Sequence, residues 1–175
     1  MFLETNEVES ILSGLKTTVM VPIRQQPPSA EYYLRKFIFS HNEKNIGKYQ
    51  WCYRNSEFKI HDEVYPLFDC PYKKGDVLIV KESYMKEAKK PYKGMILIND
   101  VNAQKLCSIT EDQSKKEGVC AYNDHFNTMG SFKNGFLLYW RKLKRNKREH
   151  LWVSSNPWVW VLSFEMLSDH EVYNK

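Results

Sequence analysis

The chain carries Ser13-Gly14-Leu15-Lys16-Thr17-Thr18 near its start, at the change of hydrophobic pattern that decides the fold. Before this stretch, apolar residues recur at helical spacing between positions 8 and 12, which predicts a short helix over residues 5–14. Gly14 stands where the last residue of a helix adopts a positive φ at little cost. After it, residues 17–23 are rich in β-branched side chains and predict the first strand. The stretch is therefore a helix-to-strand turn with a lysine at its centre.

Three later segments follow in order: a Gly-Asp turn, the charged end of an apolar strand, and an aromatic strand. They are Cys70-Pro71-Tyr72-Lys73-Lys74-Gly75-Asp76, Val80-Lys81-Glu82-Ser83-Tyr84 and Asn156-Pro157-Trp158-Val159-Trp160-Val161. The continuous apolar run at 77–80 predicts a strand buried on both faces, and the alternation over 158–164 predicts a closing strand. A further strand is expected between positions 95 and 106.

Two more helices are expected in the second half of the chain. One covers residues 111–117, begins after a Ser108 or Thr110 cap and ends at Gly118. The other covers residues 136–149, with one apolar stripe and one basic stripe on opposite faces. The apolar stripe consists of Phe136, Trp140 and Leu143, and the basic stripe of Arg141, Arg145 and Arg148.

Taken in this order, the four segments resemble the ASCH domain, a small β-barrel of the PUA-like superfold. The likeness is greatest to the ASCH proteins of bacteriophage and prophage genomes. The resemblance implies a mixed α/β (α+β) fold, a PUA-like β-barrel with short flanking helices, as a single domain over residues 1–175. It does not cover residues 28–68, where we expect an inserted hairpin with strands near 36–39 and 49–53 around a turn at 45–47.

In this family a cleft lies beside the Gly-x-Lys turn, and the resemblance implies that Lys16 faces Glu82 there as the catalytic pair. An ion pair between Glu82 and Lys81 or an arginine is the alternative role for this carboxylate. A related bacterial enzyme, the N4-acetylcytidine amidohydrolase, has the motif Gly-x-Lys-Thr-x-Thr-x-Arg, with the second threonine as nucleophile. Here Val19 and Val21 occupy the nucleophile and arginine positions, and valine can neither attack a carbonyl nor hold an anion.

Five further residues are expected to contact a substrate or ligand. The two threonines directly follow the lysine, Tyr84 or Trp158 can stack on a base, and Arg24 can reach a phosphate. These residues are Thr17, Thr18, Arg24, Tyr84 and Trp158. Packing of the indole ring in the core is the alternative for Trp158.

The net charge of +5 is concentrated in one segment. Residues 141–150 hold six of the 26 basic residues and one of the 21 acidic residues, so the remainder is neutral. This pattern is typical of an electrostatic contact surface, although a solvated helix face has the same composition. The expected nucleic-acid contacts are Arg141, Lys142, Lys144, Arg145 and Arg148.

Composition excludes other classes of protein. No segment approaches the roughly 20 apolar residues of a membrane span, and the acidic first residues lack the pattern of a signal peptide, so we expect a cytoplasmic protein. The four cysteines form no Cys-x-x-Cys pair, and no histidines stand at zinc-ligand spacing, so we expect reduced thiols and no metal or other cofactor. A dyad of Cys70 with His61 has no recognisable motif.

Three hypotheses about function follow. The first is a module that binds RNA or a modified nucleotide in the cleft, with phosphates on the basic segment. The second is an amidohydrolase on N4-acylated cytidine, or a ribonuclease, that uses Lys16 and Glu82. The third is a phage-encoded protein that binds a host or virion protein through aromatic residues of the insertion. Fold alone does not choose among them.

Overall fold

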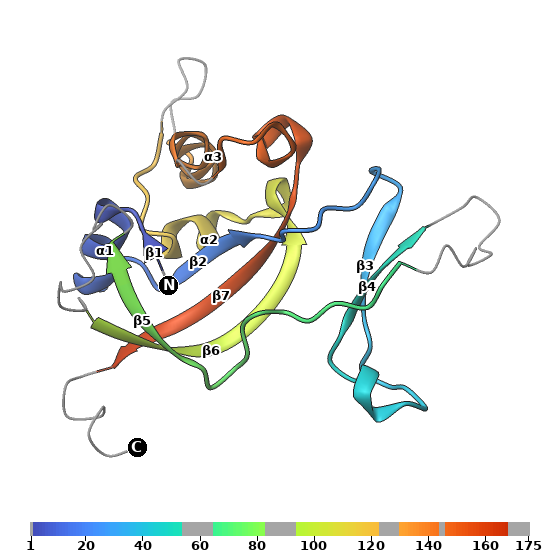
Figure 1. Cartoon of the computed structure of the whole chain (residues 1–175). Coiled ribbons are helices and arrows are strands. Elements are labelled where there is room, and N and C mark those ends of the chain that lie inside the picture. The colour runs from blue at the N-terminus through green and yellow to red at the C-terminus, as the bar shows by residue number, and fades with distance from the viewer. Residues whose placement is uncertain (1, 54–64, 83–93, 123–129, 144–145, 168–175) are drawn as a thin grey trace. The chain divides into compact units, whose positions relative to one another are not determined.

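The computed structural model describes residues 2–53, 65–82, 94–122, 130–143 and 146–167, with the backbone alone for Phe2 and Glu82 (Figure 1). The chain divides into two compact units. The main unit comprises Met1–Ile23 and Tyr72–Lys175, and the second unit comprises Arg24–Pro71. The fold is mixed α+β, with mostly antiparallel sheets and three short α-helices. In the described part of the chain, no helix is both long enough and apolar enough to cross a membrane.

The main unit is built on a five-stranded sheet in the order β1-β5-β6-β7-β2. Its strands are β1 (Phe2–Leu3), β5 (Val77–Glu82), β6 (Gly94–Lys105), β7 (Trp158–Leu167) and β2 (Thr18–Pro22). The pair β1–β5 is parallel and the other pairs are antiparallel. The β6–β7 register shifts between Ile98 and Asp100, where a bulge interrupts the longest pairing.

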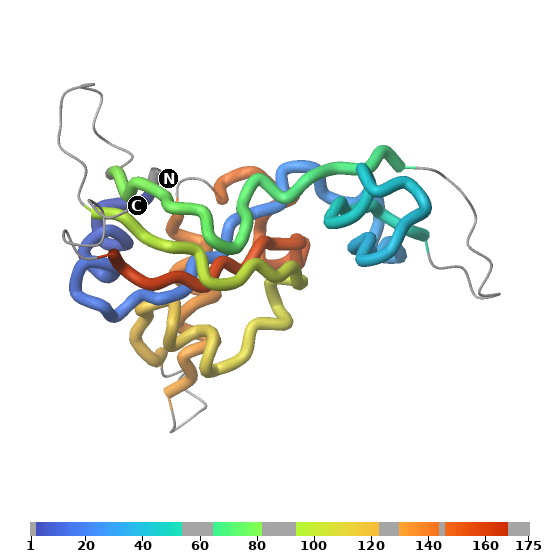
Figure 2. Tube along the Cα trace, turned by 90° about the horizontal axis from the view of Figure 1, so that it is seen from below, coloured from blue at the N-terminus to red at the C-terminus, as the bar shows by residue number. Residues whose placement is uncertain are grey.

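Among the described residues, three α-helices accompany this sheet. They are α1 (Thr5–Leu12), α2 (Glu111–Lys116) and α3 (Phe132–Lys142). The segment that contains α2 and α3 lies on one face of the sheet (Figure 2). Short 3-10 helices are η1 (Glu43–Asn45), η2 (Leu106–Ser108), η4 (Glu149–Leu151) and η5 (Val153–Ser155).

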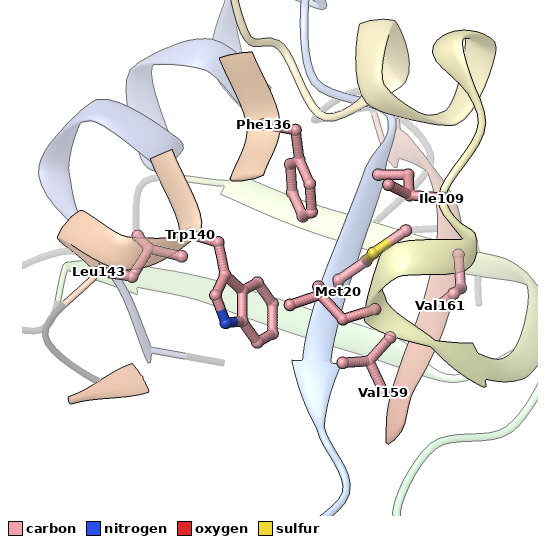
Figure 3. Close-up of a cluster of buried hydrophobic side chains, with 8 residues drawn as sticks. Met20, Ile109, Phe136, Trp140, Leu143, Val159 and Val161 are labelled. Atoms are coloured by element: carbon pink, nitrogen blue, oxygen red, sulfur yellow. The ribbon is translucent and has the colours of Figure 1, made fainter. Parts of the chain in front are cut away.

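The core between α3 and the sheet is a cluster of buried apolar side chains (Figure 3). Its members are Met20, Leu106, Ile109, Phe136, Trp140, Leu143, Val159 and Val161. The three side chains of the expected apolar stripe are all buried, but only Phe136 and Trp140 lie on α3, and Leu143 follows its end. Within the cluster, the indole nitrogen of Trp140 donates a hydrogen bond of 2.8 Å to the carbonyl oxygen of Leu151. That bond satisfies the one polar atom of the indole ring inside the core.

One carboxylate joins α2 to the start of α3. Glu111 accepts hydrogen bonds from the Ser131 hydroxyl and from the backbone N–H groups of Phe132 and Lys133. The Ser131 hydroxyl, followed by these backbone donors, holds the pKa of Glu111 below its ordinary value. The first turn of α3 therefore has some of its free N–H groups satisfied from another helix.

Several predicted elements are confirmed. The helix over 5–14 corresponds to α1, the first strand to β2 and the strand over 95–106 to β6. The predicted helix over 111–117 is α2, with Thr110 as the N-cap in a capping box and Gly118 just beyond the end at φ +73°. The short polar signals at these ends are sufficient because they act within a single turn.

Two predictions about elements are wrong. The helix expected over 136–149 begins at Phe132, because the Ser131 side chain caps it, and ends at Lys142, because Leu143 adopts an extended backbone. The strand expected to be buried on both faces is β5, but Val77 and Ile79 are 43% and 42% exposed. One face of that strand is therefore turned to solvent although residues 77–80 are all apolar.

The second unit contains a hairpin of β3 (Tyr32–Lys36) and β4 (Tyr49–Tyr53). The second predicted strand is confirmed, and the turn contains Gly47 at φ +85°. The first strand covers residues 32–36 instead of the expected 36–39. Ile38 and Phe39 lie in the connection and are 80% and 87% exposed. Trp51 is buried and donates a hydrogen bond of 3.0 Å to the carbonyl of Gln25.

Candidate functional site

A pocket of about 520 Å³ lies in the main unit between α1, the segment after α2, and α3. We call it the lysine pocket. Its polar lining comes from three parts of the sequence. It includes Glu7, Ser10 and Lys16 from α1 and the turn after it, Glu117 from the end of α2, and Tyr139 and Lys142 from α3. The Gly-x-Lys turn singled out in the sequence is therefore part of a cavity.

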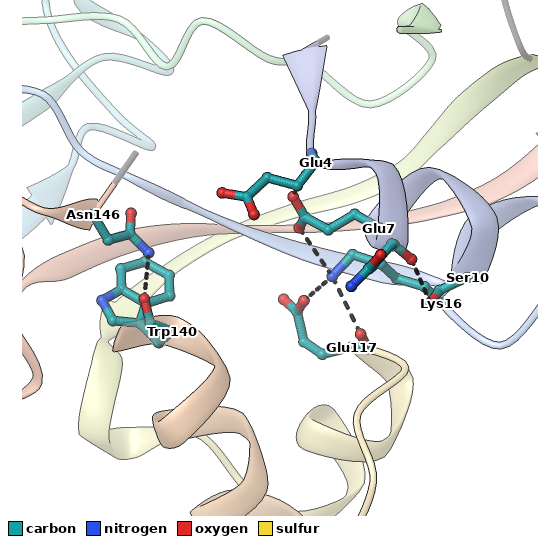
Figure 4. Close-up of polar contacts among 8 residues, drawn as sticks. Glu4, Glu7, Ser10, Lys16, Glu117, Trp140 and Asn146 are labelled. Carbon is teal, nitrogen blue, oxygen red and sulfur yellow. Dashed lines mark hydrogen bonds and ion pairs between the residues drawn. The ribbon is translucent and has the colours of Figure 1, made fainter. Parts of the chain in front are cut away.

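Lys16 is 1% exposed and its ammonium group lies between two carboxylates (Figure 4). Its Nζ donates hydrogen bonds to Oε2 of Glu117 and, at 3.2 Å, to the backbone carbonyl of Glu117. Oε1 of Glu7 is 3.6 Å from the same nitrogen. The Tyr139 ring centroid is 5.9 Å away. The cluster formally holds one more acidic group than basic group in a largely water-free environment, where each charge has a strong effect.

Local backbone geometry fixes the position of Lys16. Its N–H donates to the Ser10 carbonyl at 2.9 Å, and the next N–H, of Thr17, donates to the Lys116 carbonyl at 2.8 Å. Gly118 follows Glu117 at φ +73°, and a β-carbon there would lie 3.1 Å from the β-carbon of Lys16. A glycine is thus required both by the backbone conformation and by the close approach to Lys16.

The α3 wall of the pocket also depends on a glycine. A β-carbon on Gly135 would overlap the carbonyl oxygen of Cys120, so the helix packs directly on the backbone of the segment after α2. Tyr122 and Ser131 exchange two backbone hydrogen bonds of 3.0 and 3.1 Å beside this contact. This packing brings Tyr139 to the same pocket as Lys16.

The carboxylate partners of Lys16 in the described structure are Glu7 and Glu117. Neither glutamate was predicted from the sequence. Glu7 carried a signal, since it shares the buried face of α1 with Val8 and Ile11, where a carboxylate requires a partner. Glu82 pairs through its backbone with Leu3, and its side chain lies outside the described residues, so the Lys16–Glu82 pair stays a prediction.

The predicted ligand contacts are dispersed. Thr17 is exposed, Thr18 is buried, and Trp158 is half-buried. None of these three is among the residues that line the described lysine pocket. Arg24 belongs to the second unit, and Tyr84 lies outside the described residues.

The basic segment borders the pocket. Arg141, Lys142 and Arg148 are exposed, and Lys142 lines the lysine pocket. Lys144 and Arg145 lie outside the described residues. The predicted basic stripe on one helix face is wrong, because α3 ends at Lys142 and the chain beyond it does not continue the helix.

Nothing in the described residues gathers three or more His, Cys, Asp or Glu side chains as a metal site would. All four cysteines are free thiols. Burial raises the pKa of Cys52, which disfavours the nucleophilic thiolate. Cys70, the residue considered for a dyad, is half-buried.

No protein-family model, no curated protein and no solved structure in the three comparisons matches the chain.

Proposed function

We propose that the protein is a nucleic-acid-binding module that holds one base of single-stranded RNA, or a modified nucleotide, in the lysine pocket. One observation carries the proposal: a residue of the basic segment, Lys142, lines the same pocket as the buried Lys16–Glu117 pair and the Tyr139 ring. Groups suited to the edge, the face and the phosphate of a nucleotide are thus brought together.

The polar groups of the pocket match the edge of a base. A lysine ammonium group donates hydrogen bonds and a carboxylate accepts them, while base edges present both acceptors and amino donors. The pocket volume of about 520 Å³ lies within the roughly 300–1,000 Å³ of small-molecule sites. The Tyr139 ring offers an aromatic surface for stacking.

The charge distribution suits the backbone of the ligand. Arg141 and Lys142 are exposed at the end of α3, and exposed basic side chains supply sequence-independent attraction to phosphates. In this arrangement the pocket provides selectivity and the basic segment provides affinity.

The finer description of the fold belongs to the same proposal. We infer a PUA-like barrel of ASCH type from the collinear motifs. The helix, Gly-x-Lys turn and first strand in sequence order, and the largely antiparallel sheet, support it. The origin in a phage or prophage genome rests on the resemblance alone.

Binding without hydrolysis is the version we favour. Val19, at the position of the threonine nucleophile in the amidohydrolase, is fully buried in β2. A packed valine cannot supply the attacking oxygen. We therefore expect no acetate release when the protein is incubated with N4-acetylcytidine, and acetate release at a catalytic rate would favour the hydrolase.

The protein-docking hypothesis has less support. Tyr32, Tyr49 and Trp51 of the hairpin are buried and serve the packing of the second unit, whereas Phe39 in the connection between β3 and β4 is 87% exposed. Most of these aromatic side chains are therefore not available to a partner, and we do not propose this hairpin as the principal binding surface.

The test of the proposal is RNA binding measured by fluorescence anisotropy with a labelled single strand. We expect Tyr139→Ala to weaken binding about tenfold, the loss of one stacked base, and Tyr139→Phe to retain most of the affinity. Lys74→Gln is the control, because Lys74 is an exposed lysine of the main unit outside the lysine pocket. Wild-type protein that binds no RNA, or equal affinity in all variants, would overturn the proposal.

A further inference from the structure

A second pocket, of about 490 Å³, lies at the C-terminal end of α3 in the main unit. We call it the tryptophan pocket. Its lining includes Trp140 and Arg141 from the helix, Asn146 and Lys147 from the chain after it, and Trp152 beyond η4. Apart from Arg141, none of these residues belongs to the site predicted from the sequence, and none lines the lysine pocket.

Trp152 supplies an accessible aromatic face. It is 49% exposed, whereas Trp51, Trp140 and Trp160 are at most 2% exposed. Its indole nitrogen donates a hydrogen bond of 3.2 Å to the carbonyl of Lys147, which holds the ring in place. An exposed and positioned indole is a surface on which a planar ligand stacks.

Two cationic side chains line the same pocket. Arg141 and Lys147 line the pocket and are exposed. A guanidinium and an ammonium group beside one cavity favour an anion, and a phosphate group can bind both.

Asn146 supplies a buried acceptor. The residue is 2% exposed, and its Nδ2 donates a hydrogen bond of 3.3 Å to the Trp140 carbonyl. That carbonyl can only accept, so the amide nitrogen must face it and Oδ1 lies on the other side (Figure 4). Among the described residues, Oδ1 has no hydrogen-bond partner. Such an atom calls for a donor from outside the described fold.

We propose that the tryptophan pocket binds a nucleotide whose base carries an amino group. The base stacks on Trp152, its amino group donates to Oδ1 of Asn146, and its phosphate contacts Arg141 and Lys147. An aromatic face, a cationic rim and a buried acceptor together fit a nucleotide better than a simple anion, which has no ring to stack, or an apolar ligand, which has no charge.

The pocket deepens the proposed function as a second subsite, and in this respect it rests on that function. Lys142 lines the lysine pocket and its neighbour Arg141 lines the tryptophan pocket. Successive residues of a helix differ by about 100° in direction, so the two pockets open on different faces of the same end of α3. A single strand that crosses this end can place one base in each.

The first experiment uses mononucleotides and the full chain. Adenosine 5′-monophosphate is titrated while the indole N–H signal of Trp152, assigned through Trp152→Phe, and the Asn146 side-chain amide signals are followed by NMR. Purine riboside 5′-monophosphate, which lacks only the amino group, is the matched ligand. We expect both sets of signals to shift with the adenine nucleotide, at least fivefold weaker binding without the amino group, and at least tenfold weaker binding in Trp152→Ala.

The second experiment measures the same variants with single-stranded RNA, beside Tyr139→Ala. Weaker RNA binding in both Trp152→Ala and Tyr139→Ala supports two subsites. RNA binding that depends on Tyr139, with no nucleotide-induced shift at Trp152 and no effect of Trp152→Ala, overturns the second subsite and leaves the proposed function standing. A shift at Trp152 without any RNA binding supports a nucleotide pocket and overturns the shared strand. Shifts of equal size with both mononucleotides overturn the role of Asn146.

Discussion

Lys16 is enclosed by Glu7 and Glu117, and removing its charge leaves two buried carboxylates without their shared cation. We predict that Lys16→Met lowers the free energy of unfolding by about 3–5 kcal/mol, because an uncompensated buried charge costs far more than an intact pair contributes. Urea denaturation followed by circular dichroism measures this change.

A matched variant separates charge from packing. Lys16→Met combined with Glu7→Gln and Glu117→Gln removes all three charges, so it should recover much of the lost stability. If the single variant unfolds at the same urea concentration as the wild type, Lys16 and its two carboxylate partners do not stabilise the fold. The same reasoning makes Lys16→Ala a poor test of catalysis, since lost activity would accompany lost folding.

Glu111 gives the structure a pH dependence of definite sign. Its pKa is lowered by the Ser131 hydroxyl and the backbone donors of α3, so the stabilisation is present above the ordinary carboxyl pKa and is lost as the pH falls through the lowered folded pKa. We predict that wild-type protein is more stable than Glu111→Gln at pH 7 and that this difference disappears in acid. Thermal unfolding of both proteins from pH 7 to pH 2 measures it, and a difference independent of pH would contradict it.

The sequence singled out Lys16, and of its two carboxylate partners only Glu7 could have been predicted from the sequence. The lysine belongs to a short local motif, whereas Glu117 is distant in sequence and meets Lys16 only through the bridge between the two turns. The helical pattern does indicate Glu7, because it lies four residues before Ile11 and therefore on the same buried face of α1.

Among the elements, α3 depends on Gly135 for its distance from the segment after α2. Gly135→Ala would gain up to about 1 kcal/mol of helix propensity, but its methyl group would overlap the Cys120 carbonyl. We predict a net destabilisation of about 1–3 kcal/mol, as for other overpacked sites, and displacement of the Tyr139 wall. Denaturation curves and RNA affinity check this, with Lys142→Ala, at an exposed position of the same helix, as the stability control. A more stable Gly135→Ala protein would contradict this prediction, because it would show that the Cys120 backbone can move away from the added methyl group at little cost.

The ends of α2 could be predicted and the end of α3 could not. Thr110 and Gln113 form the capping box within one turn, so four consecutive residues of sequence suffice. Beyond Lys142 the sequence remains favourable for a helix, but Asn146 donates its backbone N–H to the Leu143 carbonyl and its side-chain amide to Trp140. These contacts close a turn that helical propensity alone does not anticipate. The exposed face of β5 likewise depends on packing, which its apolar sequence does not report.

For the whole molecule, the concentration of positive charge predicts salt-dependent binding. The affinity for single-stranded RNA should fall linearly with salt on a double-logarithmic plot, with a slope of about −0.7 for each phosphate contacted. Neutralising Arg141, Lys142 and Lys147 together should make this slope shallower by about 2, while the circular dichroism spectrum is unchanged because these side chains are exposed. An affinity independent of salt concentration, or a slope unchanged by the substitutions, would show that the basic segment does not contact the RNA.

The strand order has a consequence for folding during synthesis. The last described strand, β7, lies between β6 and β2, and β2 pairs with it across almost the whole length of the chain. As the chain leaves the ribosome, β2, with Val19 and Met20, cannot pair until β7 has been synthesised. This delay follows from the long sequence separation of the two strands. A nascent chain stalled before Trp158 exposes an apolar strand edge, so synthesis, rather than the finished protein, is the stage at which aggregation is the greater hazard.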